Sequence, residues 1–337
     1  MIPIQNIYYM LSYAFQVLNE QGYKNIATEQ FNNTGELMAA ILEKGIAIQI
    51  KRGLGKEYIP QTEALSSLRG KIDIAESIKT QSMLRKQLIC TYDEFSVNSI
   101  MNRIIKSTVE LLLRSNISKQ RKKNLRKLMV YFSEVDFIDL YTVNWNVQYN
   151  RNNQTYRMLI SICYLVVKGL LQTQSNGHTE LMDFLDEQRM CRLYEKFILE
   201  YYRKEFKNQF TANASQIPWQ LDNEENSMLP VMQSDIMLQS GEKVLIIDAK
   251  YYEHSTQVQF DKHTLHSDNL YQIFTYVKNK EYELREKNHT VSGMLLYAKT
   301  DEEIYPNNVY QMSGNQITVR TLDLNLPFDE IAGQLNT

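Results

Sequence analysis

LPVMQSDIMLQSGEKVLIIDAKYY, residues 229–252, is the stretch that decides the fold of the C-terminal half of this chain. An apolar-rich run at residues 231–238 and a second run at residues 244–252 flank the polar, glycine-containing turn QSGE, a pattern that predicts a β-hairpin. The second run opens with four apolar residues, VLII, so both faces of this strand are apolar. We therefore expect it to be a buried central strand of a sheet.

Charged residues enter this buried strand at its far end. Asp248 and Lys250 are two residues apart, so they point to the same side of a strand, with Ala249 on the other. Burying a charge without a partner is costly, so the pattern requires compensation. A simple salt bridge between Asp248 and Lys250 is one explanation. Asp235, on the paired strand, favours the alternative of a functional site.

Two carboxylates and a lysine at the end of a sheet are suited to phosphodiester hydrolysis. Asp235 and Asp248 can hold a hard divalent cation such as Mg²⁺, and the carbonyl of Ala249 can add a ligand. Such a cation stabilises charge on the scissile phosphate and lowers the pKa of a bound water. Lys250 can orient or deprotonate that water, or screen the phosphate.

A helix is predicted after the hairpin, and Gln272 and Tyr276, four residues apart, share one of its faces. The order of Asp, Asp-x-Lys and a helical Gln-x-x-x-Tyr resembles the PD-(D/E)xK nuclease core in its RecB-like variant. Ser234 replaces the proline of that pattern, at a position that supplies no ligand.

The same resemblance implies a further site residue on the helix predicted at residues 190–206. In this core the helix before the hairpin commonly places a carboxylate beside the metal. Glu195 borders the apolar stripe of this helix and is the candidate. An ordinary exposed glutamate explains the position equally well. Glu200 lies on the same helix and points in another direction.

Length and composition limit the class of protein. With 337 residues, 43% hydrophobic and 23% charged, the chain is long enough for two globular domains. The sequence has no signal peptide and no apolar run of about 18 residues or more, so we expect no membrane span. Three scattered cysteines indicate a reducing cytoplasm. A net charge of −2 predicts that, if the chain acts on DNA, a partner supplies much of the binding affinity.

The N-terminal half is predicted to be rich in helices. We expect two strands within residues 48–74, joined by a polar excursion, which is either a contact device or a plain surface hairpin. Residues 118–127 predict a helix with six basic residues, which fits either a DNA backbone contact or a solvated helix face. The polar stretch at residues 172–178 is the expected link between domains.

Motifs along nearly the whole chain resemble the McrC family, the nuclease subunits of McrBC 5-methylcytosine restriction systems. The stretches that carry the resemblance are IPIQNIYYMLSYAF from residue 2, RGL from residue 52, LRGKI from residue 68, NRIIKST from residue 102, LIIDAKYY from residue 245 and HSDNLYQIFTY from residue 266. Each is weak alone, and together they are specific.

This resemblance implies an α+β fold with a helix-rich, partner-docking domain at residues 1–180 and a PD-(D/E)xK nuclease domain at residues 181–337. It implies a McrB-like AAA+ GTPase partner, a hexameric ring that reads and translocates methylated double-stranded DNA, while McrC stimulates GTP hydrolysis and cuts the DNA with Mg²⁺. A finger-like hairpin near residues 48–74 is expected to enter the ring pore and to offer it cations, namely Lys51, Arg52, Lys56, Arg69 and Lys71.

Two other functions compete with this interpretation. One is an activator that regulates an AAA+ ring without cutting DNA, and the complete set of Asp235, Asp248 and Lys250 argues against it. The other is a stand-alone RecB-like repair nuclease, which should cut DNA with Mg²⁺ and no partner.

Overall fold

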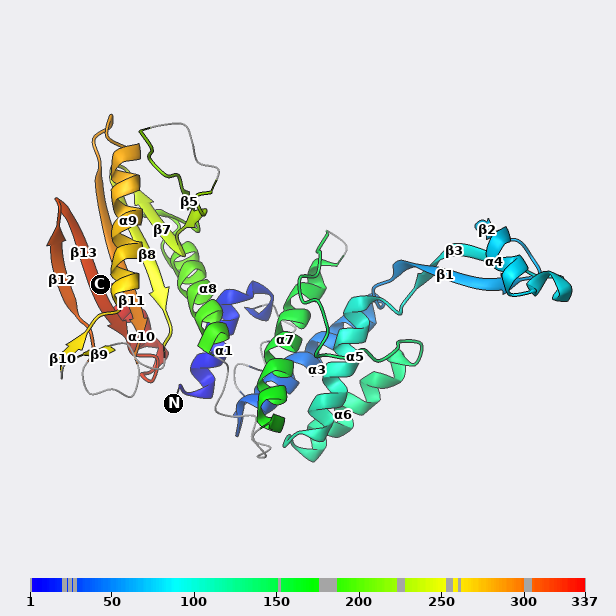
Figure 1. Ribbon diagram of the computed structural model, residues 1–337. Coiled ribbons are helices and arrows are strands. Elements are labelled where there is room, and N and C mark those ends of the chain that lie inside the picture. The colour runs from blue at the N-terminus through cyan, green and yellow to red at the C-terminus, as the bar shows by residue number, and fades with distance from the viewer. Residues whose placement is uncertain are drawn as a thin grey trace. The chain divides into compact units, whose positions relative to one another are not determined.

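Two compact units make up the chain in this computed structural model, the C-terminal unit of residues 1–28 and 184–337, and the helical unit of residues 29–183 (Figure 1). The predicted domain boundary near residue 180 lies close to the observed one. The first 28 residues belong with the C-terminal unit, so the predicted assignment of residues 1–180 to one domain is wrong at its start. The structure describes residues 2–19, 23, 26, 29–150, 153–175, 187–222, 228–252, 257–259, 262–299 and 305–336.

A mixed sheet of six strands, in the order β12-β13-β11-β8-β7-β4, is the centre of the C-terminal unit. Its strands are β4 (Thr211–Asn213), β7 (Ile236–Ser240), β8 (Lys243–Lys250), β11 (Thr290–Ala298), β12 (Asn308–Met312) and β13 (Asn315–Leu322). The described helices of this unit are α1 (Ile4–Ala14), η1 (Gln16–Asn19), α8 (Glu187–Glu205), α9 (Ser267–Glu283) and α10 (Phe328–Leu335). These elements confirm a mixed α/β architecture.

Strand β8 is the buried central strand that its sequence predicts. It pairs antiparallel with β7 and parallel with β11, and Ile246 and Ile247 are fully buried. Gly241 turns the chain between β7 and β8 with φ 58°, a conformation that glycine adopts readily. The first predicted strand is divided, because β6 (Met232–Gln233) pairs with β5 (Gln216–Ile217). Asp235 consequently lies between β6 and β7 rather than inside a strand.

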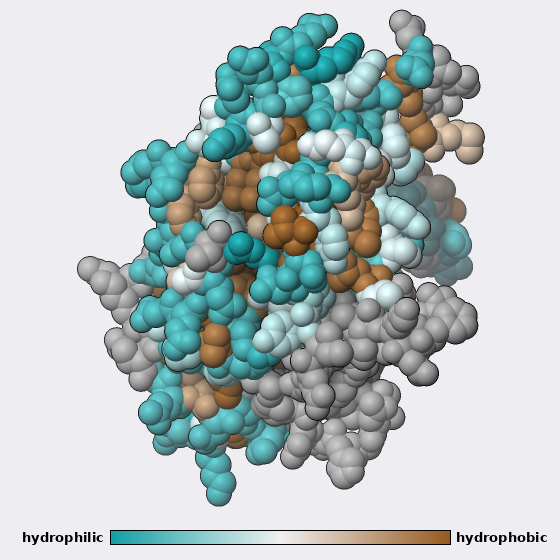
Figure 2. Space-filling view, turned by 90° about the vertical axis from the view of Figure 1, so that its left-hand side faces the viewer, coloured by the Kyte–Doolittle hydropathy of each residue, from teal (hydrophilic) through white to brown (hydrophobic). Residues whose placement is uncertain are grey.

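The outer edge of the sheet is formed by β12, which pairs with β13. Val309 on this strand is 59% exposed. Figure 2 views the molecule from the side on which Figure 1 draws β12, and hydrophobic residues in brown reach the surface there between hydrophilic ones in teal. With only five residues, β12 is a short edge strand, and this limits its pairing with other chains.

Helix α1 joins the C-terminal unit because its apolar side chains are buried against that unit. The ring of Tyr9 stacks on Phe328 of α10, with centroids 4.5 Å apart. The side-chain amide of Asn6 donates a hydrogen bond of 2.7 Å to the carbonyl of Leu324. Periodicity predicts that this segment is an amphipathic helix, but it cannot identify the core that the apolar face joins.

Helices dominate the helical unit. They are α3 (Thr34–Arg52), α5 (Ile100–Arg114), α6 (Lys119–Met129), η4 (Val130–Phe132) and α7 (Gln154–Ser175). A three-stranded sheet in the order β1-β3-β2 extends from them, with β1 (Glu57–Leu65), β2 (Lys71–Asp73) and β3 (Leu88–Ser96). Two short helices, α4 (Ile74–Lys79) and η3 (Ser82–Arg85), lie between β2 and β3. We call residues 57–96 the finger, which projects from the helices of its own unit in Figure 1.

The finger differs from the hairpin predicted at residues 48–74. Residues 48–52 end helix α3, and β1 pairs with β3 over nine residue pairs, from Glu57↔Ser96 to Leu65↔Leu88. Strand β2 also pairs with β3, so the partner of the first strand comes later in the sequence than expected. The tip at residues 66–87 is not simply polar, because Ile74, Ile78 and Leu84 are 62%, 62% and 81% exposed.

Two side chains hold both ends of the finger. The amide nitrogen of Asn102, on α5, donates to the carbonyls of Gly55 (2.9 Å) and Val97 (2.8 Å). Tyr156, on α7, donates to the Asn102 side-chain oxygen (2.8 Å) and accepts from the Gly55 N–H (2.7 Å). Because Asn102 is fully buried, these hydrogen bonds join the finger firmly to α5 and α7.

None of the described helices has both the length and the apolar character needed to cross a membrane. The three cysteines are free thiols. Cys90 and Cys163 are buried, so their sulfur atoms pack as small apolar groups.

The packing of α9 on β11 generates a stability prediction. A Cβ at Gly293 would meet side-chain carbons of Ile273 at 2.8 Å, Ile317 at 2.9 Å and Val277 at 2.9 Å. Gly293→Ala should therefore overpack the core and lower the free energy of unfolding by about 1–3 kcal/mol, measured by urea denaturation. Gly333→Ala in α10 is the control, since nothing lies within 4 Å of its added Cβ. Equal stability of the two variants would contradict the close approach.

Candidate active site

Asp248 and Lys250 form a buried ion pair at the carboxyl end of β8. The Lys250 Nζ lies 2.8 Å from Oδ2 of Asp248, and the two side chains are 13% and 2% exposed. The ammonium of Lys250 is therefore the direct charge partner of this buried carboxylate. The predicted salt bridge is therefore present, and the Lys250 ammonium compensates the charge of this buried oxygen.

Asp235 completes the group from the segment between β6 and β7. Its Oδ2 accepts a hydrogen bond of 2.9 Å from the backbone N–H of Ala249. Burial, and then the negative charge and hydrogen bonding of Asp248, raise the pKa of Asp235 to about 8, with a smaller contribution from Glu195. Asp248 is buried and Asp235 is half-buried. Two carboxyls this close cannot easily both ionise, so Asp235 holds a proton near neutral pH.

Lys250 is a firmly charged member of the site. Burial by itself lowers the pKa of an ammonium, but the carboxylate of Asp248 outweighs it and raises the pKa of Lys250 above its usual value. Of the three roles that the sequence leaves open for Lys250, this arrangement favours orienting a water or screening a phosphate over removing a proton.

Helix α9 contributes the two predicted side chains. Nζ of Lys250 donates a hydrogen bond of 3.1 Å to the side-chain oxygen of Gln272. The nitrogen of the same amide donates to the hydroxyl of Tyr276 at 2.9 Å. Gln272 therefore touches the lysine directly, whereas Tyr276 acts on it only through Gln272.

Glu195, and not Glu200, lies beside Asp235. The two carboxyls line one open pocket of about 350 Å³. Glu200 instead forms an ion pair with Arg203 at 2.7 Å. The two glutamates leave α8 in different directions, and only Glu195 of the two points toward Asp235.

Sequence reasoning did not select three residues of α8, of which two line this pocket and the third contacts Glu195. Arg192 and Lys196 line it and add positive charge. Cys191 donates a hydrogen bond of 3.0 Å to Glu195, and burial together with this carboxylate raises the pKa of the thiol to about 12. Cys191 and Arg192 lie one helical turn before Glu195, and Lys196 follows it directly. This spacing is the only sequence signal that could have identified them.

The donor set can be tested against a divalent cation. Among the described residues, no group of three or more His, Cys, Asp and Glu side chains converges as a metal site does. Asp235 and Asp248 do converge, and both supply carboxylate oxygens. Hard oxygen donors of this kind suit Mg²⁺, which commonly binds one or two carboxylates and keeps several waters.

The five cations predicted to meet a partner do not all lie on the finger. Lys51 and Arg52 belong to the last turn of α3, which precedes the finger in the chain. On or next to the finger, Lys56 immediately precedes β1 and Lys71 opens β2. Arg69 precedes β2, and its guanidinium lies 4.1 Å from the centroid of the Tyr92 ring.

These features define a mixed α/β protein with a buried two-carboxylate and lysine site, joined to a helical unit that carries a projecting finger. The family model described as a McrBC 5-methylcytosine restriction system component matches residues 5–298. The Type IV methyl-directed restriction enzyme EcoKMcrBC of Escherichia coli (strain K12) is 30% identical over 330 residues, 96% of this chain and 93% of that protein. The chain therefore belongs to the McrBC restriction system component family, which confirms the resemblance carried by its motifs.

Two solved structures show a weaker similarity. A refined half-complex from the tetradecameric assembly of Thermococcus gammatolerans McrB AAA+ hexamers with bound McrC is 18% identical, with a TM-score of 0.49 over 99% of this chain and 75% of that one. The Thermococcus gammatolerans McrBC complex is 22% identical, with a TM-score of 0.44 over 60% of this chain and 59% of that one. Both TM-scores are low, so family membership rests on the sequence comparisons.

The raised pKa of Asp235 predicts a pH dependence of stability. The folded chain binds a proton that the unfolded chain releases between the ordinary pKa of 3.8 and about 8. Stability should therefore fall as pH rises through this window, on the order of 1 kcal/mol per pH unit. Asp235→Asn should remove this slope in urea denaturation without divalent cations. The exposed Asp222→Asn is the control, and a wild-type slope that persists in Asp235→Asn would contradict the assignment.

Proposed function

We propose that this chain is the DNA-cleaving subunit of a restriction complex that acts on 5-methylcytosine-containing DNA. Its reaction is Mg²⁺-dependent hydrolysis of phosphodiester bonds, by an endonuclease site of the PD-(D/E)xK type. The observation that carries the proposal is the convergence of Asp235, Asp248 and Lys250 at the end of β8. Membership of the McrBC family supports it.

Each side chain has a role that its contacts support. Asp235 and Asp248 would hold Mg²⁺, with the carbonyl of Ala249 as a further ligand. When bound, the cation supplies charge for the phosphate and lowers the pKa of a water. Lys250 keeps its ammonium in place through Asp248 and Gln272 and donates hydrogen bonds to the water or phosphate.

The remaining predicted site residues act around this centre. The hydroxyl of Tyr276 accepts a hydrogen bond from the amide nitrogen of Gln272. This contact keeps the amide oxygen of Gln272 directed toward Lys250. Glu195 borders the pocket with Asp235 and adds negative charge, which strengthens the attraction for a divalent cation.

The partner is proposed from the relatives and from the finger. A related structure is described as McrB AAA+ hexamers with bound McrC, and we propose a McrB-like hexameric GTPase ring for this chain as well. The ring supplies binding of methylated double-stranded DNA, consistent with a net charge of −2 on this chain. The finger enters the ring and stimulates GTP hydrolysis. Both proteins act in the cytoplasm, where free thiols persist.

Asp248→Asn tests the chemistry. The amide keeps the shape of the side chain but loses the negative charge. DNA cleavage by the complex should fall by at least about 100-fold, the upper end of the loss when only an outer-shell partner of a metal ligand is changed. Stimulation of GTP turnover should not change. Glu200→Gln, which disturbs only the ion pair with Arg203, should cleave as the wild type does. Equal cleavage by Asp248→Asn and wild type at limiting Mg²⁺ would refute the metal assignment.

Shortening the finger tests the partner role. Leu65 and Leu88 are directly paired, so an Asn-Gly turn can replace residues 66–87 and close the hairpin. The anchor at Asn102 remains, and the free energy of unfolding should change by less than about 1 kcal/mol, because loop closure depends weakly on length. GTP turnover of the partner should no longer be stimulated, and DNA cleavage should be lost with it. Full stimulation by the shortened chain would refute the role of the finger and indicate that the partner binds the helices of the helical unit.

A further inference from the structure

Five cations on helix α6 make no ion pair or hydrogen bond to any other described residue through their side chains. At about 100° per residue they fall within an arc of about 140° around the helix axis. Helix α6 contains no acidic residue, so nothing on the helix itself offsets this charge. The outward face of α6, as we call this arc, consists of Lys119, Lys122, Lys123, Arg126 and Lys127.

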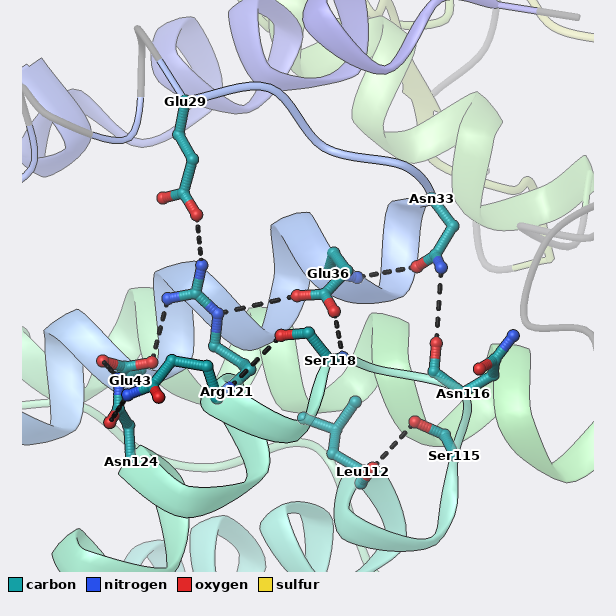
Figure 3. Close-up of polar contacts among 11 residues, drawn as sticks. Glu29, Asn33, Glu36, Glu43, Leu112, Ser115, Asn116, Ser118, Arg121 and Asn124 are labelled. Carbon is teal, nitrogen blue, oxygen red and sulfur yellow. Dashed lines mark hydrogen bonds and ion pairs between the residues drawn. The ribbon is translucent and has the colours of Figure 1, made fainter.

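The sixth basic residue of the helix, Arg121, fixes the direction of that face. Its guanidinium turns toward α3 and lies 2.5 Å from Glu29, 2.9 Å from Glu43 and 3.6 Å from Glu36 (Figure 3). Leu125, next to Arg121 around the helix, is fully buried. The helix therefore cannot rotate to hide its other cations, of which four are exposed and Lys122 is half-buried.

The start of the helix is held as well. The backbone N–H of Ser118 donates to Glu36, and the Ser118 hydroxyl accepts from the backbone N–H of Arg121 at 3.2 Å as the N-cap (Figure 3). This cap and the acidic residues of α3 make α6 a rigid support.

The spacing of the charges fits a nucleic-acid backbone. From Lys119 to Lys127 the helix rises about 12 Å, at 1.5 Å per residue. Duplex DNA carries a charge about every 1.7 Å along its axis, so about seven phosphates lie over the same length. Five cations over this length approach the charge density of the duplex.

The side chains also indicate how such a contact would work. The amides that could read base edges are engaged elsewhere, since Gln120 donates to Asn124 at 2.9 Å and Asn124 donates to Glu43 at 3.0 Å. Four of the five outward cations are lysines, which act as point charges and not as planar forks. Contacts of this type position a duplex without reading its sequence.

We propose that the outward face of α6 binds the phosphate backbone of duplex DNA, independently of sequence and methylation. This goes beyond the proposed nuclease function, because α6 belongs to the helical unit and the candidate active site to the C-terminal unit. The net charge of the chain is −2, but this one surface is strongly positive. The chain itself can therefore contribute to DNA binding.

The test measures binding of the full chain to a 30-base-pair unmethylated duplex by fluorescence anisotropy, with EDTA present, over a series of salt concentrations. One variant replaces Lys119, Lys122, Lys123, Arg126 and Lys127 by glutamine, which has nearly the helix propensity of lysine. The matched control removes the same charge from exposed sites, by glutamine at Lys44, Lys207, Lys243, Arg285 and Lys287. A second variant replaces the four lysines of the face by arginine.

The glutamine variant of α6 should bind at least about 10-fold more weakly at low salt, and the slope of log Kd against log salt should fall by about three to four. The control set should change affinity less than about twofold, and the arginine variant should bind as the wild type does. Binding in EDTA does not require the nuclease site, so failure of the proposed cleavage chemistry would leave these results intact.

Three results would overturn the proposal. The first is undetectable wild-type binding at low salt. The second is an equal loss in the α6 and control variants, which would show an effect of net charge only. The third is unchanged DNA affinity in the α6 variant, and if that variant then failed to join the GTPase partner, the face would bind an acidic protein surface instead.

Discussion

Burial of opposite charges at the end of β8 is the constraint on which the C-terminal unit depends. Asp248 is nearly inaccessible to water, and removing one member of such a pair leaves an uncompensated charge that is strongly destabilising. The strand must therefore bring Lys250 beside it, and the fold brings Asp235 close enough for the charge of Asp248 to raise its pKa. The same arrangement that makes the site costly to build leaves carboxylate oxygens that a hard cation can occupy.

A second set of buried polar contacts organises the helical unit. Asn102 and Tyr156 satisfy one another and hold Gly55 and Val97, so the finger begins and ends on two packed helices. The finger itself contributes little to a core, and several apolar side chains of its tip are exposed. A firmly anchored element with exposed apolar side chains at its tip fits the proposed contact with a partner.

The two units divide the proposed work between them. The C-terminal unit holds the candidate hydrolytic site, and the helical unit offers the finger and the outward face of α6. Arg121 shows how the same basic segment serves two purposes, because one cation turns inward to α3 while five remain outward. A chain with net charge −2 can thus present a local surface suited to DNA.

The sequence by itself determined the elements whose signal is local: the buried strand with Asp248 and Lys250, the face shared by Gln272 and Tyr276, and the family, through motifs spread along the chain. Tertiary structure decided what depends on distant partners. It placed the first helix in the C-terminal unit, paired β1 with β3 instead of β2, and turned Glu195 rather than Glu200 toward Asp235. Periodicity tells which face of an element is apolar, whereas strand pairing and the choice of core depend on packing between residues far apart in the chain.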